Sequence, residues 1–331
     1  MTAEQREQCP DVLKKFLTYH ETIAGHSSKT IDEYFLDMRL FFRFLNLSRG
    51  IVSAVPFDEI PIKNVDITFL EKVTLDEVYE YLNFLSRERP KQKNSPKTAY
   101  GLEASARARK IACIRSFFKY ITSKTHQTDK NPVVDIESPR QRKALPQYLT
   151  LDESLGLLES VQGRHETRDY AILTIFLNCG LRRSELAGLN LSNLKEDKIR
   201  ILGKGNKERD LFLNEACLTA LRNYLDVRPD IAGETALFLS GQNKRMHTNT
   251  IHALVKKHLL AAGLDVTRYS SHKLRHTAAT LMLSNGVDVR TLQQILGHDH
   301  LNTTQIYTHV DNSELRLAAR ANPLSRAKKK R

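Results

Sequence analysis

The sequence predicts a mainly α-helical protein of two domains, the second of which also contains a small antiparallel sheet. Apolar residues recur at helical spacing over most of the chain, as they do in Thr30–Leu45. A basic segment that contains two prolines, Ile136–Gln147, has the composition of a semi-extended linker between two helical regions. Two short runs, Ile199–Leu202 and Asp210–Leu213, flank the turn residues Gly203–Arg209 and predict a β-hairpin.

The linker sets the domain boundaries. We assign residues 1–137 to a helical N-terminal domain, residues 138–148 to the linker, residues 149–320 to the second domain and residues 321–331 to a basic tail. A chain of 331 residues suits two domains, and a hydrophobic content of 40% is sufficient to fill a core in each.

Four helices are predicted in the N-terminal domain from the spacing of their apolar residues. They span Asp11–Ala24, Thr30–Leu45, a segment capped by Thr74 that runs to Arg87, and Leu102–Ser123. Two further segments contain prolines: Ser48–Glu71 is predicted to be a long connection, and the polar segment Glu88–Lys97 a solvated loop.

The helix at Leu102–Ser123 has a basic face. It carries Arg107, Arg109, Lys110, Arg115 and Lys119. Such a charge run is usually a solvated face, and in a basic protein it is equally a track for phosphates. We take Arg107, Lys110 and Arg115 as candidate DNA contacts.

A capping box, Thr150-Leu151-Asp152-Glu153, opens the second domain. Further helices follow at Thr167–Cys179, Arg182–Gly188, Asn214–Asp226, Thr248–Ala262, Ser271–Asn285, Asp288–Leu296, Thr303–Val310 and Leu315–Arg320.

The chain is strongly basic. Its 51 lysines and arginines exceed its 38 acidic residues and give a formal charge of +13. This excess fits a polyanion such as nucleic acid, although net charge alone is equally consistent with a merely soluble basic surface.

The cysteines and the hydropathy of the chain point to a soluble protein of the cytoplasm. The 4 cysteines are far apart and lack paired spacing, so we expect reduced, packed thiols rather than a disulfide framework or a zinc site. The sequence has neither a segment that resembles a signal peptide nor an apolar run long enough to span a bilayer.

Several residues of the second domain are suited to acyl or phosphoryl chemistry. His272 and Arg275 lie one helical turn apart and therefore on one face. A second imidazole, His298, follows a glycine, and Tyr307 supplies a phenol nearby. Taken alone, each residue has an ordinary alternative, and a tyrosine in a helix such as Tyr307 is commonly part of a core.

Two other segments add basic residues. Arg182 begins a helix and is followed one turn later by Glu185, whereas Lys204 stands between two glycines at the tip of the predicted hairpin. Arg182 is otherwise an ordinary helix-surface arginine, and Lys204 an exposed hairpin lysine. An ATP-binding phosphate loop requires Gly-Lys-Ser/Thr at the start of a helix, so the Gly-Lys-Gly sequence between strands excludes that interpretation. A zinc-protease site is excluded because Lys273 stands where that motif needs glutamate and Arg275 would repel a metal ion.

Five blocks of the sequence follow the order that is typical of one family. They are Gly180–Leu186, Gly203–Arg209, His272–His276, Leu296–His298 and Tyr307–His309. In these blocks the chain resembles the tyrosine recombinases, or phage integrase family, and is most similar to the Xer-type branch. The resemblance covers residues 150–320 and extends more loosely to Ser27–Leu45 and Ser105–Ile121.

The resemblance implies a two-domain clamp around double-stranded DNA. Residues 1–137 would be a helical, SAM-like core-binding domain, and residues 149–320 a mostly helical catalytic domain with a small antiparallel sheet. Four subunits, identical or of two kinds, would assemble on paired DNA sites, with no membrane, metal or other cofactor involved. The tail, including Asn322–Arg326, would dock on a neighbouring protomer. The segments Ser48–Glu71 and Glu88–Lys97 are longer than in compact family members.

The resemblance also implies an electrostatic role for four residues. Arg182 and Arg275 would bind the non-bridging oxygens of a phosphodiester and stabilise its pentacoordinate transition state without a divalent metal. His298 would donate a hydrogen bond to a phosphate oxygen, and Glu185 would orient the basic groups.

Three residues would carry the covalent chemistry in this family. Tyr307 would be the nucleophile that forms a 3′-phosphotyrosyl link. Lys204 would protonate the leaving 5′-oxygen, and His272 would act in acid–base transfer. The covalent link conserves the ester energy, so strand exchange would need no ATP.

A site-specific recombinase is the main functional prediction. Its roles would be Xer-type resolution of chromosome or plasmid dimers, which serves chromosome partition at cell division, or DNA integration of a phage or transposon. One alternative is a monomeric nicking and resealing enzyme similar to type IB topoisomerases. A second alternative, a non-catalytic DNA-binding regulator, is disfavoured because all the proposed catalytic positions are filled.

Overall fold

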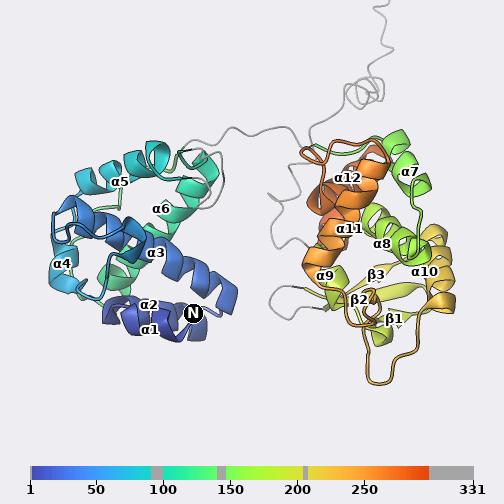
Figure 1. The fold of residues 1–331 in the computed structure, drawn as a ribbon, viewed down its shortest axis with the longest axis horizontal. Helices are drawn as coiled ribbons and strands as arrows, with labels where there is room; N and C mark the ends of the chain where they lie inside the picture. The colour runs from blue at the N-terminus through green and yellow to red at the C-terminus, as the bar shows by residue number, and fades with distance from the viewer. Residues whose placement is uncertain (1, 91–99, 140–146, 204–207, 298–331) are drawn as a thin grey trace, which may run out of the picture. The chain divides into compact units, whose positions relative to one another are not determined.

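The structure, a computed structural model, describes residues 2–90, 100–139, 147–203 and 208–297. The chain divides into two compact units, Met1–Lys143 and Ala144–Arg331, each with its own hydrophobic core. Both units are mainly helical, and the second also contains a small antiparallel sheet (Figure 1). The predicted fold class is therefore confirmed. The division falls within the predicted linker 138–148, and the function assigned to each domain stays a prediction.

The first unit is built around α3. Its elements are α1 (Ala3–Gln8), α2 (Asp11–Thr22), α3 (Ser28–Ser48), the 3-10 turn η1 (Phe57–Glu59), α4 (Ile67–Glu71), α5 (Leu75–Arg87), α6 (Ala104–Lys119) and the π-helical turn η2 (Tyr120–Lys124). Helix α3 begins at a cap in which the side chain of Ser27 accepts a hydrogen bond from the backbone N–H of Thr30. It packs against α2, α5 and α6 through fully buried residues that recur every three or four positions: Phe35, Met38, Phe41, Phe42 and Leu45.

Parts of the first unit differ from the prediction. The segment Ser48–Glu71, predicted to be a connection, contains η1 and α4, and α1 was not expected. Helix α4 has only five residues, which is too short to give a periodic pattern. Its start is fixed locally, because the side chain of Asp66 accepts a hydrogen bond from the N–H of Phe69. The predicted loop at Glu88–Lys97 lies largely outside the described residues.

The second unit surrounds α8. Its elements are α7 (Leu151–Glu159), α8 (Glu166–Cys179), α9 (Arg183–Gly188), the 3-10 turn η3 (Leu191–Asn193), β1 (Leu194–Lys195), β2 (Lys198–Leu202), β3 (Glu208–Phe212), α10 (Glu215–Val227), α11 (Thr248–Ala261), α12 (Ser271–Ser284) and α13 (Val289–Leu296). Helix α8 packs against both α10 and α12. It is apolar around most of its circumference, as expected for a central helix, and its fully buried residues are Ala171, Ile172, Leu173, Ile175 and Phe176. The predicted capping box at Thr150 is present, whereas the helices predicted at Thr303–Val310 and Leu315–Arg320 lie outside the described residues.

The predicted antiparallel pair of strands is present, but the second strand begins earlier than predicted. Glu208 and Arg209, assigned to the turn Gly203–Arg209, belong to β3, because they pair with Leu202 and Ile201 of β2. Strands β2 and β3 pair antiparallel from Lys198↔Phe212 to Leu202↔Glu208, and β1 adds a third strand in the order β1-β2-β3. Because side chains alternate along a strand, Leu211 faces the core together with Ile199 and Ile201. Arg209 lies on this same inward face.

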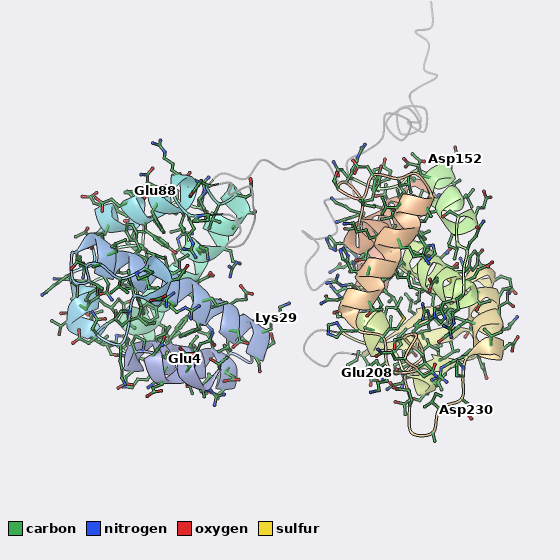
Figure 2. The ribbon with its side chains drawn as sticks, in the orientation of Figure 1. Glu4, Lys29, Glu88, Asp152, Glu208 and Asp230 are labelled. Atoms are coloured by element: carbon green, nitrogen blue, oxygen red, sulfur yellow. The ribbon has the colours of Figure 1, made fainter. Side chains whose placement is uncertain are left out.

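Charged side chains cover the surface of both units. Lys29 and Glu88 in the first unit, and Asp152 and Glu208 in the second, are exposed and project from their helices and strand (Figure 2). The 4 cysteines are buried free thiols, in agreement with the expected packed state. Over the part of the chain that is described, no helix has the length and hydropathy needed to cross a bilayer.

Candidate active site

A buried carboxylate lies at the centre of the site. Glu185 is in the first turn of α9, and its side chain is only 4% exposed. Its Oε2 accepts a hydrogen bond from the backbone N–H of Arg182 at 2.8 Å, and its Oε1 accepts one from Nη1 of Arg182, also at 2.8 Å. The short helix therefore holds the Arg182 and Glu185 side chains together at its N-terminus.

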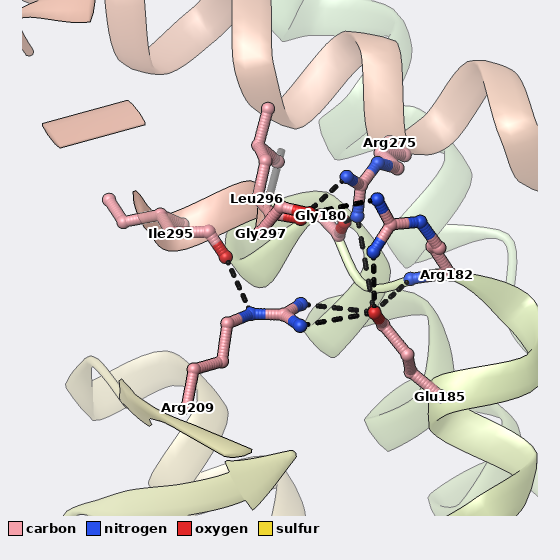
Figure 3. Close-up of polar contacts among 8 residues, drawn as sticks. All are labelled: Gly180, Arg182, Glu185, Arg209, Arg275, Ile295, Leu296 and Gly297. Carbon is pink, nitrogen blue, oxygen red and sulfur yellow. Dashed lines mark hydrogen bonds and ion pairs between the residues drawn. The ribbon is translucent and has the colours of Figure 1, made fainter. Parts of the chain in front are cut away.

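A second arginine reaches Glu185 from the sheet. Nη1 and Nη2 of Arg209 donate to Oε1 and Oε2 of Glu185, each at 3.1 Å, in a bidentate pair (Figure 3). Planar guanidinium and carboxylate groups fit each other in this geometry, which makes it a strong form of ion pair.

A third arginine comes from α12. Arg275 is 3% exposed, and its Nη1 lies 4.0 Å from Oε2 of Glu185. Its guanidinium donates to the carbonyl oxygen of Gly180 at 2.6 Å and to that of Leu296 at 2.7 Å. Gly180 ends α8 in the left-handed conformation, with φ of 60°, so Arg275 connects the ends of α8 and α13.

The three arginines also converge on the C-terminal end of α13. Nε of Arg209 donates to the carbonyl oxygen of Ile295 at 3.2 Å, and Nη2 of Arg182 donates to that of Gly297 at 3.0 Å. With the bond from Arg275 to Leu296, three successive carbonyls each have a guanidinium partner (Figure 3). These carbonyls cannot be satisfied within the helix and carry its partial negative charge, so cations are favoured beside them.

The cluster has an excess of positive charge. Three guanidinium groups share one carboxylate, which leaves a formal surplus of two charges that an anion can neutralise. Burial opposes the charged form of Glu185, but hydrogen bonds from Arg209 and Arg182 outweigh it and hold the pKa of Glu185 below its ordinary value. The side chain of Arg182 remains 39% exposed, so an anion in solution can reach it.

His272 lies in the first turn of the same helix as Arg275. Its ring contacts that of His276 edge to face, with 4.6 Å between ring centroids. Partial burial, followed by the positive charges of Arg275, Lys273 and Arg182, lowers the pKa of His272 from its ordinary value of 6.5. The imidazole is therefore neutral at pH 7, the form in which it can accept a proton.

The structure thus brings together three of the predicted site residues, Arg182, Glu185 and Arg275, with His272 on the same helix as Arg275. Lys204, His298 and Tyr307 lie outside the described residues. In sequence, however, Lys204 precedes strand β3 and His298 directly follows Gly297.

Arg209 was not among the predicted site residues, although it lies in one of the five sequence blocks, Gly203–Arg209. The alternation of side chains along β3 contains the missing signal. An arginine at a position that points toward the core requires a buried anion, and Glu185 lies in another of the quoted blocks.

The candidate DNA contacts of the first unit lie on α6. Nζ of Lys110 donates to Oδ1 of the buried Asp37 at 2.7 Å, and the side chain of Lys110 is only 11% exposed. Nη1 of Arg107 donates to Oγ of Ser86 at 2.6 Å, and Nη1 of Arg115 to Oγ of Ser138 at 3.1 Å. A phosphate would have to compete with Asp37 for the charge of Lys110.

A basic pocket adjoins this face. Its volume is about 360 Å³, and the cationic residues that line it are Arg39, Arg43, Arg89, Arg109 and Lys110. Burial, with Arg39 and Arg89 acting in the same direction against Asp58, lowers the pKa of Arg43 to about 10. Arg43 therefore stays charged at neutral pH. Asp58 also lines the pocket and pairs with Arg43 and Arg89, so an anion there would compete with a carboxylate.

Comparison of the sequence with known families and proteins gives consistent matches. The sequence model described as "Phage integrase family" matches residues 147–314. The tyrosine recombinase XerC of Caldanaerobacter subterraneus subsp. tengcongensis is 51% identical over 96% of this chain and 88% of its own length. The XerC protein of Thermodesulfovibrio yellowstonii is 33% identical over 95% of this chain and 97% of its own length.

Solved structures match the fold of the chain. The XerH site-specific recombinase, bound to its difH substrate in a pre-cleavage complex, has a TM-score of 0.63. It is 22% identical, and the match covers 93% of this chain and 84% of the XerH chain. A lambda integrase dimer bound to a COC′ core site has a TM-score of 0.61 at 15% identity, over 89% of this chain and 75% of the integrase chain.

Proposed function

This chain belongs to the Xer-type tyrosine recombinases of the phage integrase family, enzymes of site-specific DNA recombination, and we propose that it cleaves and rejoins double-stranded DNA through a 3′-phosphotyrosyl intermediate on Tyr307. The observation that supports this chemistry most is the arrangement of Arg182 and Arg275 around Glu185. Three guanidinium groups against one carboxylate leave a net positive charge, which fits the phosphodiester anion better than it fits a neutral substrate.

The basic cluster would act on the phosphate directly. Attack on a phosphodiester concentrates negative charge on its non-bridging oxygens, and fixed cations stabilise that charge. Arg182 is the more accessible of the two arginines, so it would make the first contact. Arg275 is buried, and its bonds to Gly180 and Leu296 fix the direction of its guanidinium.

The covalent step conserves atoms and charge. The phenolic oxygen of Tyr307 would form a bond to phosphorus while the bond from phosphorus to the 5′-oxygen breaks. His272, neutral at pH 7, would take part in transfer of the phenolic proton, and Lys204 would give a proton to the leaving oxygen. His298 would donate a hydrogen bond to a non-bridging oxygen. Attack by the freed hydroxyl of the other strand would reverse the step, so neither a metal ion nor ATP is required.

The reaction would take place in a tetramer on two paired sites. Exchange of strands between two duplexes needs four cleavages, hence four nucleophiles. Membership of the Xer-type branch favours resolution of chromosome or plasmid dimers, the role that the resemblance in sequence implies, over integration of a mobile element.

A nicked-duplex experiment tests the proposal. Duplexes selected from a random pool for binding to the protein would be nicked next to the cleavage position and incubated with the protein in a chelator of divalent metals. We expect a covalent protein–DNA adduct, and its loss in Tyr307→Phe. An adduct that persists in this variant would assign the nucleophile to another residue. Relaxation of supercoils without exchanged products would favour the topoisomerase-like alternative instead.

A further inference from the structure

Arg209 belongs to the arginine cluster but has no role in the chemical steps proposed above. It lies on the inward face of β3, and its side chain is 16% exposed. All three guanidinium nitrogens have partners, because Nη1 and Nη2 bind the Glu185 carboxylate and Nε binds the carbonyl oxygen of Ile295 (Figure 3). Arg209 is thus directed toward the protein, whereas Arg182 keeps an exposed edge.

Arg209 affects how the negative charge of Glu185 is shared among the arginines. Glu185 carries one negative charge, and Arg209 satisfies both of its oxygens. Arg182 also donates to Oε1 of Glu185, so the three arginines share one carboxylate, with a formal surplus of two positive charges. Without Arg209, Arg182 and Arg275 alone would share the carboxylate, and the formal surplus would fall to one positive charge.

Arg209 also controls the position of the end of α13. Its Nε binds Ile295, and a Cβ atom on Gly297 would lie 2.8 Å from its Nη1. The same end of α13 supplies the carbonyls that bind Arg182 and Arg275, and the chain continues directly into His298. A shift of Arg209 would therefore alter the partners of both arginines.

We infer that Arg209 is a positioning residue for strand cleavage: it binds Glu185 and the α13 terminus, and so holds Arg182 and Arg275 in the positions from which they would bind the phosphate. The inference rests on the proposed function. Arg209 itself does not touch the DNA. Because small displacements of catalytic groups can cost about 10²-fold in rate, its loss should slow cleavage about tenfold to a hundredfold.

The test compares Arg209→Gln with a matched control on the same hairpin. Arg200 on β2 is paired with Asp210 on the solvent-facing side of the sheet, so Arg200→Gln removes the same charge without disturbing Glu185. Single-turnover cleavage of the nicked duplex, DNA affinity and thermal unfolding would be measured for each protein. We expect Arg209→Gln to cleave about tenfold to a hundredfold more slowly. Its DNA affinity should stay within about threefold of the unmodified protein, because Arg209 does not contact a phosphate and the loss of a phosphate contact would weaken binding more. Arg200→Gln should behave as the unmodified protein.

Three readouts separate positioning from a merely structural role. Glu185 faces Arg182, Arg209 and Arg275, and hydrogen bonds from Arg209 and Arg182 lower its pKa against the effect of burial. In Arg209→Gln the pKa of Glu185 should therefore rise, which NMR titration of the DNA-free protein would detect. The effect of Arg209→Gln on rate should also be much smaller in a Glu185→Gln background, because no carboxylate is then left to cancel a charge. Arg209→Lys should restore part of the rate, since it keeps the charge but loses the bidentate fit.

The inference is overturned by an unchanged cleavage rate in Arg209→Gln. It is equally overturned by a rate loss that is the same in the Glu185→Gln background and is not accompanied by a change in the pKa of Glu185. Absence of any adduct with the unmodified protein would instead remove the proposed function, and the positioning role with it, while the titration would still report the Arg209–Glu185 ion pair.

Discussion

At the scale of single residues, the site depends on one buried anion and three cations. Taking a carboxylate out of water costs several kcal/mol, and good geometry with complete hydrogen bonding offsets that cost. Glu185 has such geometry, with bonds from Arg182 and Arg209 to both oxygens and Arg275 at 4.0 Å. Because the charges are interdependent, removing the carboxylate affects all three arginines at once.

Replacement of Glu185 tests this interdependence through stability. Glu185→Gln leaves three guanidinium groups without an anion, and we expect it to lower the free energy of unfolding by about 3–5 kcal/mol. Glu208→Gln is the matched control, because the side chain of Glu208 is 60% exposed. The control should stay within about 0.5 kcal/mol of the unmodified protein in denaturant unfolding. Equal effects of the two substitutions would argue against a buried ion cluster.

The pH dependence of stability gives a second test of Glu185. Its pKa is lowered in the folded protein, so its charged form contributes stability above its ordinary value of 4.5, and that contribution is lost as pH falls through the folded-state pKa. The free energy of unfolding of the unmodified protein should therefore fall below pH 4.5 more steeply than that of Glu185→Gln. Parallel curves for the two proteins would contradict the assignment.

At the scale of secondary structure, the site is formed where elements end. Helix α9 begins at Arg183, just after Arg182, and α8 ends at Gly180. Helix α13 ends at Gly297, where φ is 62°, a left-handed conformation that glycine adopts without strain. Helix ends leave unpaired backbone groups, and here the arginines satisfy them.

Substitution of Gly297 tests the contact at the end of α13. Gly297→Ala adds left-handed strain of about 1–3 kcal/mol. It also places Cβ within 2.8 Å of Nη1 of Arg209. Gly286→Ala is the control, since Gly286 also has positive φ, of 90°, but a Cβ there would meet nothing within 4 Å. We expect both variants to lose stability and only Gly297→Ala to slow cleavage. Similar cleavage rates in the two variants would show that the contact with Arg209 does not matter.

Much of this arrangement could be predicted from the sequence, and the elements and contacts that were not predicted have physical explanations. The long helices, such as α3, were predicted because their apolar residues repeat over several turns. Helix α4 was not, because its five residues give no repeat. The Arg182–Glu185 pair could be predicted because the two residues lie one helical turn apart. The Arg209–Glu185 pair instead joins a strand to the start of a helix 24 residues earlier in the chain. The alternation along β3 shows that Arg209 faces inward, but tertiary packing determines which anion it meets.

At the scale of the whole molecule, the net charge of +13 is divided between two units. Each unit offers basic groups of its own, at the pocket lined by Arg43 and Lys110 in the first and at the Glu185 cluster in the second. If both units bind the backbone of one duplex, many phosphates are neutralised together. Binding should then release many counterions and depend steeply on salt.

Salt titration of DNA binding tests this whole-molecule expectation. The logarithm of the association constant should fall linearly with the logarithm of salt concentration, with a slope close to −0.9 for each phosphate contacted, that is, roughly −6 or steeper for a clamp with several contacts. The association constants for duplexes with and without the target site should both show this dependence on salt concentration. A nearly flat response would contradict a clamp that binds through backbone phosphates.

Paired guanidinium groups are proposed to bind a DNA phosphate through its negative charge, and a substrate without that charge would test this proposal. Single-turnover cleavage would be measured for the unmodified protein and Arg182→Ala on two nicked duplexes. One carries the natural scissile phosphodiester and the other an uncharged methylphosphonate at the same position. We expect Arg182→Ala to slow cleavage of the phosphodiester by about 10²–10³-fold, as for the loss of one stabilising group, and to slow cleavage of the methylphosphonate far less. An equal loss of rate on both substrates would contradict this proposal.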